Sequence, residues 1–273
     1  MSRSIDLNRA SWDERVPAHE ASPGYAVEQF TEDPGFLSRV VRFDRARLGD
    51  ISGLDGVHLQ CHIGTDTVSL ARLGARMTGL DFSEPAVEAA RRLAEATGAE
   101  AQFVVSELYD APDVLGRERF DLVYTGIGAI CWLPDIHRWA QVVAALLRPG
   151  GRLFIREGHP MLWTVDEKRT DALAIEFPYF ETPEPMEWDE GGTYVETDVV
   201  FETTITHSWN HGLGEIVTAV LDAGMEITGL EEHTTVPWDA LPGQLETAEN
   251  GEHQLKIRRE RLPLTYTLQA RKR

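Results

Sequence analysis

Residues 57–83 read VHLQCHIGTDTVSLARLGARMTGLDFS and hold two short apolar segments with a helical pattern between them. The first segment ends at Gln60, the helical pattern covers residues 65–73, and the second segment ends on Asp81. A strand, a loop, a helix and a second strand in this order begin the parallel sheets that bind nucleosides beyond their strand ends. The stretch therefore predicts an α/β fold with a ligand site near Asp81.

The alternation of apolar segments and amphipathic helices continues beyond this stretch. The helix expected at 84–97 follows a Ser83 cap, carries Pro85 in its first turn and stops before Gly98, as helix ends favour. We predict a doubly wound, Rossmann-like fold with a seven-stranded, mostly parallel sheet. The expected strands include 57–60, 76–80, 101–105, 120–125 and 152–157, with a further helix over 134–147.

The region before the sheet is expected to form a helical N-terminal cap over residues 1–50. One helix starts near Asn8 or Ser11, either of which suits an N-cap, and another has apolar spacing over 36–48.

Residues 51–273 form the expected main domain, which closes with a strand at 262–270. Within it, residues 158–211 change character and are rich in aromatic residues and prolines. The β-branched run at 193–209 reads as one or two extended strands. We interpret 158–211 as an insertion that covers a substrate site.

Charge and composition narrow the partners. The 273 residues carry a net charge of -19, which repels phosphate backbones and anionic lipid. We therefore expect a small-molecule partner and neither nucleic acid nor membrane; the oligomeric state is open. Two cysteines and no apolar run in the first ten residues fit a cytoplasmic protein. The nine histidines lack metal-site spacing, so we predict no metal.

The loop after the first strand carries the expected ligand chemistry. Gly64 lies at the bend, where glycine permits positive φ and close approach of a ligand, and a helix begins just after it. Asp81 can accept hydrogen bonds from both hydroxyls of a ribose. The alternative is that Asp81 only caps the next helix, a role that Ser83 already suits. Gln60 and His62 stand where a dinucleotide-binding loop needs glycines, which disfavours a nicotinamide-dependent oxidoreductase.

This arrangement resembles the class I S-adenosylmethionine-dependent methyltransferases, whose first motif is commonly an apolar pair and Asp-Leu-Gly-Cys-Gly-x-Gly. The resemblance covers about 100 residues in four pieces at sensible spacing. In the first piece Leu59, Cys61 and Gly64 match, whereas His58, Gln60 and His62 depart. The four pieces are HLQCHIG at 58–64, MTGLDFS at 77–83, FDLVYTGIGAICWLPD at 120–135 and LLRPGGRLFIRE at 146–157.

The resemblance implies S-adenosylmethionine as the cofactor and a set of residues around it. Phe82 would flank the adenine, Ser106 or Glu107 would lie beside it, and Thr125 would lie near the sulfonium. Glu107 reads equally as an exposed loop carboxylate and Thr125 as a strand-end hydroxyl bonded to backbone. Gln60 and His62 either turn away from the ligand, or His62 lines its edge. The implied cofactor-binding residues are Gln60, His62, Gly64, Thr67, Asp81, Phe82, Ser106, Glu107 and Thr125.

Methyl transfer is a displacement at the sulfonium methyl, in which the protein mainly aligns the reactants. His159 follows the fifth strand and is the candidate base, with Glu157 to orient it or to take a proton itself. The alternative is a structural histidine, as is common before proline. The expected acceptor-site residues are Trp12, Tyr25, Trp132, Trp163 and His211, the last also a second candidate base; the aromatic residues could equally form a small core under the insertion.

Two function classes follow. The first is a small-molecule methyltransferase acting on oxygen, nitrogen or carbon. The second is a protein on the same fold that binds S-adenosylmethionine without transferring methyl, as a non-methylating catalyst or a sensor, because a fold does not fix a function.

Overall fold

The structure, a computed structural model, describes residues 2–273 and is built on a seven-stranded sheet. The strand order is β3-β2-β1-β4-β5-β12-β8. Strands β1 to β5 are mutually parallel, and β12 runs antiparallel to both of its neighbours, so the predicted mostly parallel sheet is confirmed. The strands are β1 (Asp55–Leu59), β2 (Arg76–Asp81), β3 (Ala101–Val105), β4 (Phe120–Thr125), β5 (Leu147–Gly158), β8 (Met225–His233) and β12 (Thr265–Lys272).

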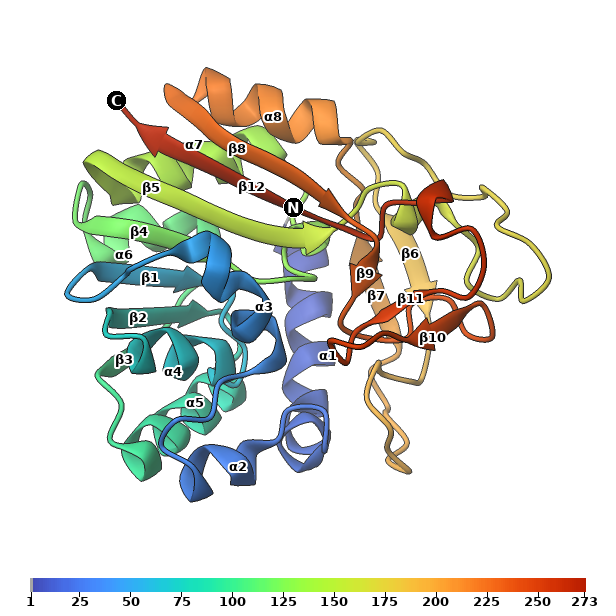
Figure 1. The fold of residues 1–273 in the computed structure, drawn as a ribbon, viewed down its shortest axis with the longest axis horizontal. Helices are drawn as coiled ribbons and strands as arrows, with labels where there is room; N and C mark the ends of the chain where they lie inside the picture. The colour runs from blue at the N-terminus through green and yellow to red at the C-terminus, as the bar shows by residue number, and fades with distance from the viewer. Residues whose placement is uncertain (1) are drawn as a thin grey trace.

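Helices cover both faces of this sheet, as the alternating pattern predicts. Helices α3, α4 and α5 pack on one face and α6, α7 and α8 on the other, each burying an apolar stripe against the strands (Figure 1). Their bounds are α3 (Arg39–Leu48), α4 (Thr65–Arg72), α5 (Glu84–Thr97), α6 (Ala111–Leu115), α7 (Ile136–Leu146) and α8 (Leu213–Asp222). None of the helices within residues 2–273 is long and apolar enough to cross a membrane.

Local signals placed several of these elements correctly. The Ser83 hydroxyl accepts a hydrogen bond from the amide of Ala86 and starts α5, and Gly98 ends that helix at φ 64°. Strands β3 and β4 have the predicted bounds. The helix expected from residue 36 begins later, at Arg39, because the Ser38 hydroxyl caps it by accepting from the amide of Val41.

The prediction for the start of the chain was wrong in its caps. Helix α1 spans Ser2–Ala21, so Asn8 and Ser11 lie inside it. The Asn8 side chain instead bonds both backbone groups of His207, at 2.8 Å each, and the Ser11 hydroxyl accepts from Arg15. The Asn8 side chain, which was predicted to cap a helix, therefore bonds a residue 199 positions away in the chain. A short second helix, α2 (Val27–Glu32), follows α1.

The insertion forms less regular structure than its composition predicts. Of the β-branched run at 193–209, only β7 (Ile205–Ser208) is a strand, paired with β6 (Met186–Asp189). β-Branched residues favour strands only where a partner strand lies alongside, and β6 is four residues long. In Figure 1, α1 stands across the carboxyl ends of the parallel strands, between them and the small sheets.

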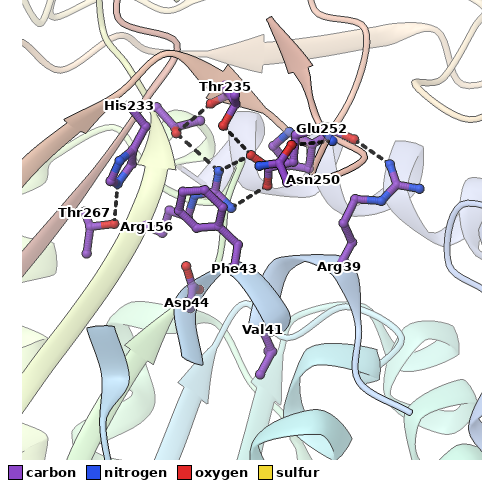
Figure 2. A network of polar contacts seen from close by, with 12 residues as sticks. Arg39, Val41, Phe43, Asp44, Arg156, His233, Thr235, Asn250, Glu252 and Thr267 are labelled. Atoms are coloured by element: carbon purple, nitrogen blue, oxygen red, sulfur yellow. Dashed lines mark hydrogen bonds and ion pairs between the residues drawn. The ribbon is translucent and has the colours of Figure 1, made fainter. Parts of the chain in front are cut away.

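A buried ion pair joins the main sheet to a three-stranded sheet of β9 (Thr235–Val236), β10 (Leu245–Thr247) and β11 (His253–Leu255). Arg156 of β5 and Glu252 are 0% and 1% exposed and meet through two hydrogen bonds of 2.9 Å. Thr235 donates to the same carboxylate, and the centre of the Phe43 ring lies 3.5 Å from the guanidinium carbon of Arg156 (Figure 2). Each charge is therefore neutralised where water is excluded.

Candidate functional site

A pocket that is partly open to solvent lies beyond the carboxyl ends of β1 to β4, where the fold was expected to bind a ligand. Its lining includes Ile5, Asn8, Trp12, Tyr25, His58, Gln60, His62, Asp66, Asp81, Phe82, Ser106, Glu107, Gly126, Ile127, Gly128, Trp132 and Tyr194.

The loop between β1 and α4 is left-handed at two positions that lack glycine. Gln60 has φ 57° and His62 has φ 49°, a backbone region that costs L-residues about 1–2 kcal/mol each. The side-chain NH2 of Gln60 donates to the backbone carbonyl of Ala129 at 2.9 Å, while the side-chain oxygen of Gln60 is buried without a hydrogen-bond partner. Backbone strain and an unpaired buried side-chain oxygen therefore both occur in this loop, at the wall of the pocket.

Gly64, predicted to contact the ligand, does not line the pocket. It has φ 79°, and a Cβ built on it would lie 2.7 Å from the Ala90 Cβ and 2.9 Å from the Phe103 ring. Glycine is required there because α4 approaches α5 and β3 closely. Its role is in packing.

Asp81 ends β2 and is 5% exposed. One carboxylate oxygen accepts from the amide of His62 at 2.8 Å and the other from the amide of Ser83 at 3.0 Å. Burial raises its pKa to about 6, with these backbone hydrogen bonds opposing the rise and the charge of Asp13 adding to it. Each oxygen keeps a lone pair for a further donor, so the side chain both fixes the loop and faces the pocket.

Three further predicted residues lie on the same side of the pocket as Asp81, after β2 and β3. Phe82, Ser106 and Glu107 all line it. The Glu107 carboxylate accepts from the amide of Tyr109 at 3.1 Å, and burial raises its pKa. The structure thus brings Glu107 and Ser106 together at the wall rather than in an exposed loop.

Aromatic and histidine side chains close the pocket from α1 and the insertion. The ring of Trp12 meets that of Trp132 at 5.4 Å, edge to face. His19 of α1 lies within 2.7 Å of His62 through one ring nitrogen and within 2.7 Å of the Thr193 hydroxyl through the other. The Tyr25 and Tyr194 hydroxyls are hydrogen-bonded to each other. Three segments distant in sequence therefore meet over the loop between β1 and α4.

Helix α1 and the insertion are also tied to each other outside the pocket. The Arg15 guanidinium donates to the carbonyls of Thr203, Glu190 and Gly192 at 2.9 to 3.2 Å. The Glu14 carboxylate accepts from the amides of Glu202 and Thr203. These bonds join the N-terminal helix to the segment at 190–203.

The structure does not bring the two predicted catalytic residues to the pocket. Glu157 accepts from the amides of Gly128, Ala129, Ile130 and Gly158, so it holds the loop that follows β4. His159 accepts from the amide of Met161 at 3.0 Å and meets Glu232 at 2.9 Å. Both side chains are buried at the end of β5, and neither lines the pocket.

Four other predicted residues also lie outside the pocket lining. The Thr67 hydroxyl bonds His58 at 2.8 Å, and Thr125 is fully buried. The Trp163 ring, within the insertion, stacks on that of Trp238 with 5.9 Å between ring centres. His211 lies 2.7 Å from Glu181 and faces the carbonyls of Ile130 and Leu133, which fixes the turn before α8.

Sequence reasoning missed several lining residues. Asn8, His58, Asp66 and Tyr194 all reach the pocket. The weak signal for Asp66 was its place in the first turn of the helix after the ligand loop, and that for Gly126 and Gly128 was the run TGIG after β4. Nothing local pointed to Asn8 or Tyr194, which come from elements folded over from elsewhere.

Residues 57–153 match the family model of a methyltransferase domain. The chain is 33% identical over 161 residues to a ubiquinone biosynthesis O-methyltransferase of Methylobacterium sp. (strain 4-46), covering 55% of this chain and 63% of that protein. It is 33% identical over 117 residues to the protein of the same name from Cupriavidus pinatubonensis, covering 40% and 45%. The chain thus spans less than two thirds of these relatives.

Solved structures give the same picture of the fold. An S-adenosylmethionine-dependent methyltransferase of Mesorhizobium loti superimposes with a TM-score of 0.57 at 21% identity, covering 86% of this chain and 98% of that one. One from Listeria monocytogenes gives 0.59 at 15%, covering 86% and 97%. A geranyl diphosphate C-methyltransferase of Streptomyces coelicolor A3(2) gives 0.55 at 14%, covering 85% and 78%.

Proposed function

We propose that this chain, which carries a methyltransferase domain on the class I fold, binds S-adenosylmethionine in the pocket and transfers its methyl group to a small molecule. The observation that carries the proposal is Asp81: a buried carboxylate at the end of β2, lining the pocket, with backbone amides as its hydrogen-bond partners. A ribose offers such a carboxylate two adjacent hydroxyl donors.

The lining residues fit this donor. Phe82 would pack on the adenine beside Asp81, with Ser106 and Glu107 within reach of the polar edge of the base. No lysine or arginine occurs among the lining residues that the structure describes, which suits a ligand that carries a sulfonium and an ammonium. When bound, S-adenosylmethionine supplies an electrophilic methyl group on its sulfonium.

The same charge pattern limits the acceptor. Asp66, Asp81 and Glu107 line the pocket, and none of its described lining residues is a lysine or an arginine, so a carboxylate or a phosphate on the acceptor would have no cationic partner there. Trp12, Trp132 and other aromatic side chains offer flat apolar walls. We infer a neutral or cationic acceptor that presents an oxygen, a nitrogen or a carbon atom.

The chain's own residues act mainly by alignment and exclusion of water. Glu157 and His159 hold backbone groups, and we assign neither a proton-transfer role. Burial lowers the pKa of His58 to about 3 and that of His62 well below its usual range, so both rings are neutral near pH 7. Such weak bases suit an acceptor that is nucleophilic without losing a proton first.

The second candidate function is binding of the donor without methyl transfer. The observation that favours it is the closure of the pocket by the His19–His62 contact at 2.7 Å, over a loop with non-glycine residues at left-handed positions.

Calorimetry and turnover separate these functions. We expect S-adenosylhomocysteine to bind the full chain and NAD⁺ not to bind under the same conditions. Incubation with S-adenosylmethionine and a panel of neutral and basic acceptors should then release S-adenosylhomocysteine. Binding without release across the panel supports the second function, and absence of S-adenosylhomocysteine binding overturns both.

A further inference from the structure

We infer that Asp66 binds the ammonium group of the donor's amino-acid tail, an assignment that rests on the proposed function. The inference starts from the direction in which the ligand must lie. With its ribose on Asp81 and its base beside Phe82, the nucleoside occupies the ends of β2 and β3. The sheet order β3-β2-β1-β4 leaves only the ends of β1 and β4 for the tail (Figure 1).

At that end of the pocket, two polar side chains face the space over Gly126, which follows β4. A Cβ built on Gly126 would lie 3.2 Å from the imidazole Nε2 of His58 and 3.7 Å from a carboxylate oxygen of Asp66. Because residue 126 has no side chain, both groups have access to a ligand that rests there.

Of these two groups only Asp66 can pair with a cation. His58 lies where the methyltransferase motif commonly has Asp, and its ring is buried, neutral and bonded through Nδ1 to Thr67 at 2.8 Å. Asp66, in the first turn of α4, therefore supplies the carboxylate that position 58 lacks.

Among the residues that the structure describes, Asp66 forms no ion pair with a basic side chain. Burial raises its pKa, opposed by a hydrogen bond with Ser38 and by the charge of Arg156. That arginine is already bonded through two nitrogens to Glu252. A ligand ammonium would give Asp66 the cation that the protein does not provide.

The test compares two ligands that differ in the tail. S-adenosylhomocysteine carries the amino-acid tail, and 5′-methylthioadenosine has the same nucleoside without it. For Asp66→Asn we expect the affinity for S-adenosylhomocysteine to fall about 10- to 100-fold, the size of one charge-assisted hydrogen bond, with that for methylthioadenosine unchanged within about twofold. Asp81→Asn should weaken both ligands, and Asp55→Asn, at the opposite end of β1, neither.

An equal loss on both ligands, or no loss on S-adenosylhomocysteine, overturns the assignment. Binding of methylthioadenosine by the variant also reports that its pocket is folded. A change in the ligand gives a second test. S-adenosylhomocysteine with hydrogen in place of its amino group should bind the unaltered protein about 10- to 100-fold more weakly than S-adenosylhomocysteine does. The Asp66→Asn substitution should cause no further loss of affinity for this deaminated ligand. If the unaltered protein binds none of these ligands, the proposed function itself fails.

Discussion

Two regions of this molecule bury carboxylates, and they treat them in opposite ways. Glu252, 1% exposed, has both oxygens bonded to the guanidinium of Arg156. Asp81, 5% exposed, has backbone amides as partners, and the neighbouring charge that acts on it is a second carboxylate, that of Asp13. A buried charge paired inside the protein serves the fold, whereas one left without a cation can serve a ligand. The contrast separates a structural network from a binding site built of similar groups.

The largest expected effect tests the structural side of this comparison. Glu252→Ala leaves Arg156 charged and buried without its partner, so the free energy of unfolding should fall by about 3–5 kcal/mol in urea titrations. Glu88→Ala, which breaks the exposed pair with Arg91, is the matched control and should cost under about 1 kcal/mol. Equal losses in the two variants would break the comparison.

The next effect tests the binding side. Asp81→Asn removes the charge that faces the ribose, and the affinity for S-adenosylhomocysteine should fall about 100-fold in calorimetry. Its melting temperature should change little, because removal of an unneutralised buried charge offsets the loss of one of the two backbone hydrogen bonds, only one of which an asparagine can accept. A fall in melting temperature as large as that of Glu252→Ala would make Asp81 a structural residue.

The smallest effect is on pH dependence. Burial raises the pKa of Asp81 from an ordinary 3.8 to about 6, so its carboxylate takes up a proton below about pH 6. Affinity for S-adenosylhomocysteine should fall about tenfold per pH unit below that value, and Asp81→Asn should lack this step.

The stability of the free protein should move the other way in the same pH range. The raised pKa stabilises the folded state below about pH 4, and this contribution is lost as pH rises through about 6. Thermal unfolding of the unaltered protein and of Asp81→Asn across this range gives the difference. Affinity and stability that rise together with pH would contradict the assignment of Asp81.

Much of the sheet and one wall of the pocket could be predicted from local patterns. The Ser83 cap, the glycine at 98 and the apolar runs of β3 and β4 involve groups within a few residues of one another. Asp81 was predictable for the same reason, since its place at the end of a strand fixes which edge of the sheet it reaches.

The side chains after β5 could not be predicted in this way. The sequence placed Glu157 and His159 at the correct edge of the sheet, but their directions depend on the loop at 128–130 and on β8. Those partners lie 27 or more residues away in the chain. Alternation along a strand predicts the face of the sheet on which a side chain lies. Residues distant in the chain decide whether that side chain reaches a ligand site or bonds backbone groups.

The sequence by itself determined the order of strands and helices and the carboxylate that ends β2, because periodicity, caps and strand ends are set by neighbouring residues. Only the tertiary structure decided what closes the pocket: the Asn8–His207 bonds, the His19–His62 contact and the approach of Tyr194 join segments more than 40 residues apart. It also decided that Asp66 faces Gly126. Such contacts depend on how whole elements pack, which no short stretch of sequence specifies.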